Sequence, residues 1–203
     1  MRPWGFDSPR PHHLEPAARP RERPVLRFGA PISTRRTLYA GRVINLGLET
    51  ATFPDGRQVE LEVIRHPGAA AVLPLHPDGT VSLVHQYRHA GGGMHIEVPA
   101  GLLEPGEAPE DCARRELSEE AQLAAEELTL LASIHTTPGF TDERIHLYLA
   151  RGLSPTDGQA EADEYIRVLR MPLSLALEMC RDGRLTDAKT ICALHLAAAI
   201  RSP

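Results

Sequence analysis

The chain has 203 residues, of which 42% are hydrophobic and 24% are charged, as is typical of one soluble globular domain with a small appendage. No stretch approaches eighteen uncharged apolar residues, which argues against a membrane span, and the net charge of −5 argues against general binding to nucleic acid. Three scattered cysteines exclude a disulfide framework and indicate reduced thiols in a cytoplasmic protein.

Residues 1–31 form the first segment, which contains seven prolines, six arginines and no apolar periodicity, and we expect it to be a disordered leader. Two origins fit this segment. One is a Pro/Arg-rich tail. The other is a reading frame that begins inside a neighbouring tRNA gene, because residues 6–8 and 11–13 can be back-translated to a T-loop and to a terminal CCACCA. In that case the true start lies downstream, near Val25 or Leu26.

The next part of the chain is rich in predicted strands. Partial alternation of apolar and polar residues, with turns at Pro54-Asp55-Gly56 and at residues 76–79, is typical of half-buried antiparallel strands. The strands expected here cover residues 34–40, 43–53, 59–65, 69–75, 81–87 and 95–98.

The remainder mixes helices and strands. Pro109 suits the first turn of a helix over 109–122, and two more helices are expected at 172–181 and 188–200. Strands are expected at 128–133, 145–150 and 165–169. Because no βαβ repeat is visible, the sequence predicts an α+β sandwich with a mixed sheet.

Three carboxylates carry the first chemical signal. Glu116, Glu119 and Glu120 stand at positions i, i+3 and i+4, so a helix presents them on one face. Such a cluster is tolerated if solvent screens it, as on an ordinary acidic helix face, or if divalent cations occupy it. Mg²⁺ fits the second case, because it prefers hard oxygen ligands and completes its shell with substrate phosphates.

The flanks of these glutamates favour the second case. Gly101 follows the turn at Pro99, and Glu107 stands eight residues before Arg115, which predicts an ion pair between loop and helix. The whole stretch resembles the Nudix box, written G-x5-E-x7-R-E-U-x-E-E-x-G-U with U apolar. The matching residues are Gly101, Glu107, Arg115, Glu116, Leu117, Glu119, Glu120 and Leu123.

One position departs from the box. Gln122 stands where the pattern has glycine, near the end of the helix, where left-handed backbone geometry favours glycine. We expect this residue to cost stability and not metal binding, since every carboxylate is retained. Cys112, one turn before Glu116, is interpreted as a packing residue and not as a nucleophile.

Further segments resemble the ADP-ribose pyrophosphatase subgroup of Nudix enzymes. They are Pro138, which stands 15 residues after Leu123, and the runs 38–43, 86–88 and 97–101. The resemblance implies a Nudix-type α/β/α sandwich that hydrolyses ADP-ribose to AMP and ribose 5-phosphate. Alternatives are another nucleoside diphosphate substrate (GDP-mannose, a UDP-sugar or FAD) or a Nudix domain that has become a ligand sensor.

The resemblance also implies roles for individual residues. Mg²⁺, or Mn²⁺ in its place, is expected at Glu116, Glu120 and the Ala100 carbonyl, with Glu119 sharing it. Glu164 is expected to act as the catalytic base, with Glu161 and Asp163 as alternatives. Arg115 holds the ligands, Arg88 and Phe140 contact substrate, and Gly101 and Glu107 are structural.

Finally, the resemblance implies a division of the chain and a partner. Residues 32–66 are expected to form a small antiparallel sheet that serves dimerisation, and residues 67–203 the Nudix hydrolase domain. The hairpin pattern before residue 66 has too few apolar residues for a core of its own, which agrees with a homodimer. The expected partners are therefore a nucleoside diphosphate sugar and a second copy of the chain, with no nucleic acid and no membrane.

Overall fold

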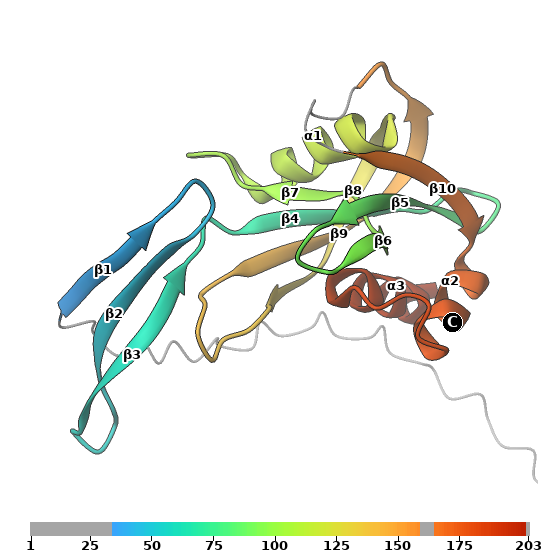
Figure 1. Cartoon of the computed structure of the whole chain (residues 1–203). Coiled ribbons are helices and arrows are strands. Elements are labelled where there is room, and N and C mark those ends of the chain that lie inside the picture. The colour runs from blue at the N-terminus through green and yellow to red at the C-terminus, as the bar shows by residue number, and fades with distance from the viewer. Residues whose placement is uncertain (1–33, 159–164, 202–203) are drawn as a thin grey trace, which may run out of the picture. The chain divides into compact units, whose positions relative to one another are not determined.

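The computed structural model describes residues 34–158 and 165–201 (Figure 1). Within these ranges the strands form three sheets and are accompanied by three helices, which confirms the predicted α+β class with a mixed sheet. None of the helices described is both long enough and apolar enough to cross a bilayer.

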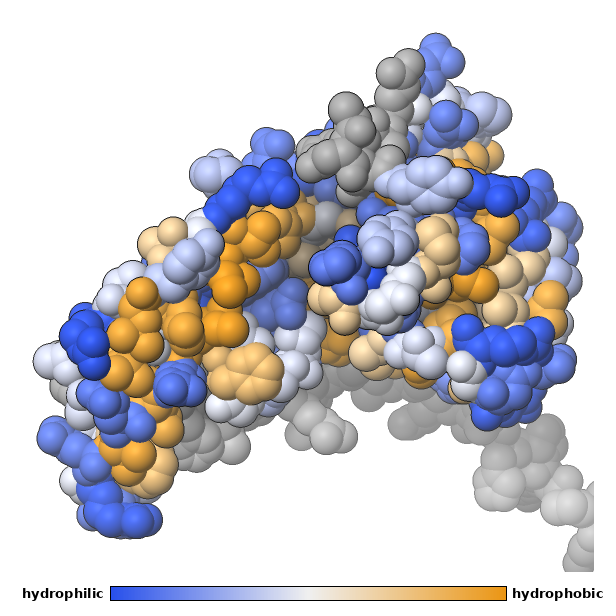
Figure 2. All heavy atoms as spheres, viewed as in Figure 1, coloured by the Kyte–Doolittle hydropathy of each residue, from blue (hydrophilic) through white to orange (hydrophobic). Residues whose placement is uncertain are grey.

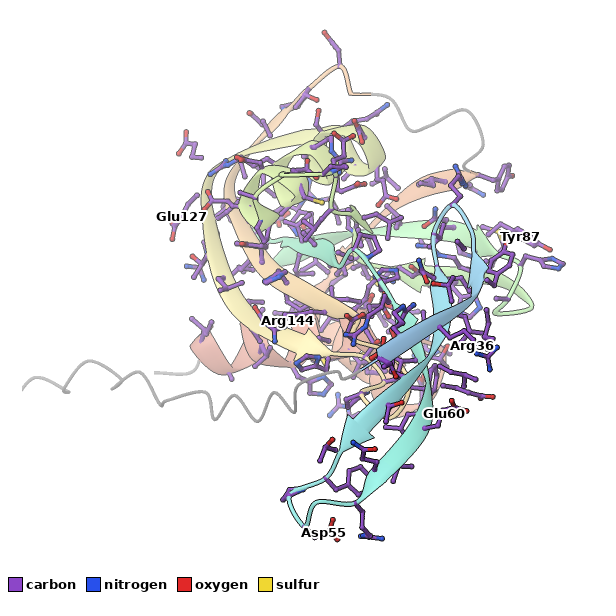
Figure 3. The ribbon with its side chains drawn as sticks, turned by 90° about the vertical axis from the view of Figure 1, so that its left-hand side faces the viewer. Arg36, Asp55, Glu60, Tyr87, Glu127 and Arg144 are labelled. Atoms are coloured by element: carbon purple, nitrogen blue, oxygen red, sulfur yellow. The ribbon has the colours of Figure 1, made fainter. Side chains whose placement is uncertain are left out.

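The N-terminal sheet contains β1 (Thr34–Ala40), β2 (Asn45–Thr52) and β3 (Gln58–Arg65), paired antiparallel in that order. Its second turn closes where Gly56, at φ +83°, donates its N–H to the carbonyl of Phe53 at 2.9 Å. Figure 3 shows Asp55 at the tip of this turn. The predicted small antiparallel sheet is therefore present, and most of its side chains are exposed or half-buried.

Two further sheets build the rest of the chain. The first has the order β7-β4-β9-β8 and the second β10-β5-β6. Strand β4 runs parallel to β9, whereas every other pair is antiparallel, so the larger sheet is mixed. The strands are β4 (Ala69–Pro74), β5 (Thr80–Arg88), β6 (Gly93–Glu97), β7 (Ala100–Leu102), β8 (Leu123–His135), β9 (Arg144–Pro155) and β10 (Ile166–Pro172).

Helices cover both sides of these sheets, and each side has its own hydrophobic core. Helix α1 (Pro109–Ala121) packs on one side, and α2 (Leu173–Arg181) and α3 (Ala188–Arg201) pack on the other (Figure 1). Strand β4 serves both cores: Ala69, Ala71 and Leu73 face α2 and α3, while Ala70 and Val72 face α1. This alternation gives the predicted α/β/α sandwich.

The structure differs from the expected elements in one additional strand, β7, and in the ends of others. Strand β7 was not expected, because three residues carry no periodicity and its partners, Ala69 to Ala71, lie some thirty positions earlier. Strands β8 and β9 are longer than predicted at both ends, since the Ala- and Glu-rich start of β8 has weak strand propensity and is set by pairing with β9.

Helix α1 ends in the conformation that the sequence predicts. Gln122 has φ 55° and ψ 39°, and it is the one non-glycine residue with positive φ among those described. Its backbone N–H donates to the carbonyl of Ser118 at 3.1 Å, which closes the last turn. The helix therefore ends where the motif predicts. The Cβ of Gln122 makes this left-handed conformation sterically unfavourable.

We expect Gln122→Gly to raise the free energy of unfolding by about 1 kcal/mol, because glycine adopts this geometry without a clash of its Cβ. Urea unfolding followed by circular dichroism would show a higher midpoint at unchanged slope. Gln122→Ala is the matched control, because it keeps the Cβ and should give no gain. Equal midpoints for the two variants would contradict the interpretation.

Candidate active site

Helix α1 is oriented by its apolar side. Cys112, Ala113, Leu117 and Ala121 are buried in the core between α1, β4 and β9. Fixing these residues also fixes the rotation of the helix. As a result Glu116 and Glu120, one turn apart, come to lie against β7 rather than in solvent.

Both of these carboxylates are nearly inaccessible, with Glu116 7% and Glu120 3% exposed. The N–H of Ala100 donates to Glu120 Oε2 at 2.8 Å, which joins the helix to β7. Gly101 leaves the room that Glu116 occupies, because a Cβ at Gly101 would lie 1.8 Å from Glu116 Oε1. The predicted metal-binding residues Ala100, Glu116 and Glu120 are thus gathered at one place.

Arg115 connects this place to the preceding loop. Its guanidinium donates to both carboxylate oxygens of Glu107 at 2.9 and 3.1 Å, to Glu116 Oε1 at 2.5 Å and to Glu119 Oε2 at 3.2 Å. It also donates to the carbonyl of Leu102 at 3.1 Å. The ion pair predicted between loop and helix is present, and the hydrogen bonds from Arg115 lower the pKa of Glu107.

Cys112, in α1, contacts strand β7. Its buried thiol lies 3.6 Å from the carbonyl oxygen of Gly101 and 3.5 Å from that of Leu102. Burial raises the pKa of this thiol to about 12, so it stays protonated and donates a weak hydrogen bond. A protonated buried thiol is a packing group and not a nucleophile.

The donors around Ala100 and Gly101 fit a hard divalent cation. Two buried carboxylates four residues apart on a helix are costly without positive charge, and carboxylate oxygens are the ligands that Mg²⁺ prefers. In the ranges 34–158 and 165–201, no three His, Cys, Asp or Glu side chains hold the arrangement of a metal site as they stand. Glu116 Oε1 accepts a hydrogen bond from Arg115 at 2.5 Å, so this carboxylate has a cationic partner in the structure.

Arg88 lies at the end of β5 and is paired with Glu97, a residue for which the sequence predicts no role. Its guanidinium donates to Glu97 at 2.9 and 3.1 Å, and Glu97 is 3% exposed. The one available signal was a glutamate within the otherwise apolar run 96–98. A buried carboxylate in such a place requires a cationic partner.

Phe140 lies apart from the glutamates, in the loop between β8 and β9, where its side chain is 52% exposed. Its carbonyl accepts the N–H of Ile64 in β3 at 2.8 Å. In the same loop Asp142 accepts from Arg65 at 2.9 Å and from the N–H of His66 at 2.9 Å. Phe140 is therefore beside the N-terminal sheet, and its predicted contact with substrate stays a prediction.

The predicted base, Glu164, and its alternatives Glu161 and Asp163 lie outside the described residues. The chain that leads toward them from β9 is held on α1. Thr156 and Ser118 share a hydroxyl hydrogen bond of 2.8 Å, and a Cβ at Gly158 would lie 1.9 Å from the carbonyl oxygen of Ser118. Residues 156–158 thus lie against the turn of α1 that carries Glu119 and Glu120.

Comparison with known proteins adds to this geometry. A family model described as the NUDIX domain matches residues 65–194. The chain belongs to the Nudix family.

Two curated relatives resemble most of the chain. A methanol dehydrogenase activator from Bacillus methanolicus is 38% identical over 78% of this chain and 86% of its own length. An ADP-ribose pyrophosphatase from Bacillus subtilis is 38% identical over 79% of this chain and 88% of its own length. Proteins named GDP-mannose pyrophosphatase, such as that of Yersinia enterocolitica, match at 37% identity over 66% of this chain.

A solved structure supports the fold. The crystal structure of an ADP compounds hydrolase superposes with a TM-score of 0.73, covering 84% of this chain and 93% of that one at 23% identity. The α/β/α sandwich with its preceding sheet is therefore an arrangement that a known hydrolase also adopts.

We expect Glu107→Gln to lower the free energy of unfolding at pH 7 by about 1.5 kcal/mol, because it removes a charge-assisted bidentate pair with Arg115. The folded-state pKa of Glu107 is lowered. Its stabilising effect is therefore complete above the unfolded value, about 4.3, and is lost as pH falls through the folded value.

Urea titrations of both proteins between pH 7 and pH 3 test this expectation. The two midpoints should converge at acid pH. Glu104→Gln, in the same loop but exposed, is the control and should match the unaltered protein throughout. Identical midpoints for Glu107→Gln and the unaltered protein at pH 7 would contradict the role of this pair.

Proposed function

We propose that the protein is a Mg²⁺-dependent pyrophosphatase that hydrolyses the diphosphate bond of ADP-ribose, giving AMP and ribose 5-phosphate. The observation that carries the proposal is the pair of buried carboxylates, Glu116 and Glu120, held against Ala100 and Gly101. Such a pair has the oxygen chemistry that binds a cation, and a diphosphate requires cations at an acidic site. The choice of ADP-ribose draws support from the relative of that name at 38% identity.

The residues divide the work as follows. Glu116, Glu120 and the Ala100 carbonyl would hold the ion, with Glu119 sharing it, and Arg115 would keep these ligands in place through Glu107. Bound there, Mg²⁺, or Mn²⁺ in its place, supplies positive charge that neutralises the diphosphate and favours attack by water.

Substrate contact and proton transfer fall to other residues. Arg88 would bind a phosphate through its guanidinium, and Phe140 would pack against the substrate of its own or of a neighbouring subunit. Glu164 would accept or orient the proton of the attacking water, with Glu161 and Asp163 as alternatives.

The second candidate is the same reaction on another nucleoside diphosphate sugar, such as GDP-mannose. The relatives named GDP-mannose pyrophosphatase favour it, since they cover two thirds of the chain at nearly the same identity. A ligand sensor is a weaker candidate, because the carboxylates of the Nudix box are all retained and the two C-terminal helices lack a basic face.

We also propose a homodimer formed through the N-terminal sheet, in a cytoplasmic protein without nucleic-acid or membrane partners. Figure 2 shows apolar side chains gathered over this sheet. Those at least 37% exposed are Leu38, Tyr39, Val43, Ile44, Phe53 and Leu61. An exposed apolar surface of this kind is typical of an interface that a partner covers.

Purified protein should hydrolyse ADP-ribose with Mg²⁺ and lose turnover with EDTA, as measured by release of AMP. Glu120→Gln should reduce kcat more than about a thousandfold, because it removes one ligand charge while it keeps an acceptor for the Ala100 N–H. Glu110→Gln removes a carboxylate from the exposed side of α1 and is the control. Higher kcat/KM for a sugar nucleotide would overturn the choice of ADP-ribose, and full activity of Glu120→Gln would overturn the metal site.

Light scattering should give twice the chain mass of 22.2 kDa. Leu61→Glu places a charge on the N-terminal sheet and should give monomers. Leu130→Glu adds the same charge at an exposed position on β8, 51% accessible, and should stay dimeric. A monomeric unaltered protein, or a dimer that tolerates Leu61→Glu, would contradict the proposed interface.

A further inference from the structure

A cluster of charged side chains joins the end of β6 to the start of α3. Glu97 accepts a hydrogen bond from Lys189 Nζ at 2.5 Å as well as those from Arg88. Lys189 also donates to Asp187 Oδ1 at 3.0 Å, and its side chain is only 12% exposed. It is the one lysine in a chain with 21 arginines, and neither the Nudix box nor the flanking motifs account for it.

Thr190, the residue after Lys189, lies in the same turn of α3. Thr190, fully buried, donates its hydroxyl to Asp187 Oδ2 at 2.5 Å and accepts the N–H of Val98 at 2.8 Å. Two residues after Val98, the N–H of Ala100 donates to Glu120. The start of α3 is therefore hydrogen-bonded to Glu97 and Val98, which immediately precede the proposed metal site in the chain.

Arg88 belongs to this cluster through its ion pair with Glu97. Burial by itself lowers the pKa of Arg88, but Glu97 first, and then the charges of Glu120 at the proposed metal site and of Asp187, raise it overall. The Arg88 side chain is 40% exposed and lines an open depression of about 350 Å³, together with His95, Glu97, Asp187 and Lys189.

The charges of the cluster decide what Arg88 is able to bind. Glu97 pairs with both Arg88 and Lys189, and Lys189 also pairs with Asp187, so two carboxylates share two cations. With Lys189 charged, Arg88 is not the sole counter-ion of Glu97, and its exposed side is able to attract an anion that enters the depression. If Lys189 were neutral, Arg88 would be the cation left to balance Glu97, and an incoming phosphate would compete with a buried carboxylate.

We propose that Lys189 is a positioning residue for substrate: by neutralising Glu97 it leaves the Arg88 guanidinium available to a phosphate of a nucleoside diphosphate. This inference rests on the proposed function. In this role Lys189 acts on Arg88 through Glu97 and is not itself a ligand of the substrate or of the ion. The predicted signature is a change in KM and not in kcat, because the carboxylates that carry out the chemistry stay in place.

Steady-state kinetics of three variants test the inference. Lys189→Met keeps the length of the side chain and removes its charge, and it should raise KM for ADP-ribose about tenfold with kcat within about threefold. Lys189→Arg restores the charge and should bring KM back to within about threefold. Arg184→Met removes one positive charge from the turn before α3, where Arg184 pairs with Asp182, and should change neither constant.

A second measurement does not depend on turnover or on the stability of Lys189→Met. With ¹⁵N-lysine labelling the protein gives a single Nζ resonance, because it has one lysine. Arg88→Gln should shift this resonance, since Arg88 and Lys189 share Glu97, and Arg184→Met should leave it in place.

The outcomes separate this inference from the proposed function. Unchanged KM in Lys189→Met, reduced stability without a change in KM, or an Nζ resonance that is blind to Arg88→Gln would overturn the role of Lys189. If ADP-ribose is not hydrolysed but another nucleoside diphosphate sugar is, the same KM comparison applies to that substrate. Absence of any turnover would overturn the proposed function, and the Nζ resonance would still decide whether Lys189 and Arg88 are coupled.

Discussion

The guanidinium of Arg115 is the interaction on which the arrangement of the site depends. It joins three segments at one point: the loop at Glu107, the end of β7 at Leu102 and the helical turn of Glu116 and Glu119. A planar group with five donors is able to do this at once, whereas the ammonium of lysine is a single point of charge. With Arg115 in place, carboxylates that would otherwise repel one another stay close.

Much of this arrangement follows from the sequence because its parts are near one another in the chain. The helix over 109–122 is predicted from Pro109 at its first turn, and in the structure it ends one residue earlier, at Ala121. The pair of Glu107 and Arg115 spans eight residues, so a loop and one helical turn are enough to form it. The left-handed conformation of Gln122 was likewise predicted from its place in the motif.

The parts that the sequence did not predict depend on contacts between distant segments. Strand β7 forms because it pairs with Ala69 to Ala71 of β4. Its three residues are too few to show a strand periodicity in the sequence. Glu97 and Lys189 are 92 positions apart, and their pairing appears only when α3 packs beneath the sheet. Local patterns report propensity and periodicity, whereas a buried ion pair is a property of the folded chain.

Two separate networks tie peripheral elements to the site. The N-terminal sheet is fastened by Arg65, which bridges Glu49 in β2 and Asp142 in the loop that carries Phe140. The start of α3 is fastened by Lys189 and Thr190 to Glu97 and Val98. Elements outside the Nudix box thus set the position of Arg88 and Phe140, the residues proposed to meet the substrate.

Strand β4 has a consequence for how the molecule comes apart. Its alternate residues belong to the cores on opposite sides of the sheet, and all six of its residues are buried. Separating α1 from the sheet would wet one side of β4, and separating α2 and α3 would wet the other, so the loss of either core exposes the strand on which the other core is built. The strand therefore couples the stability of the acidic helix to that of the C-terminal helices.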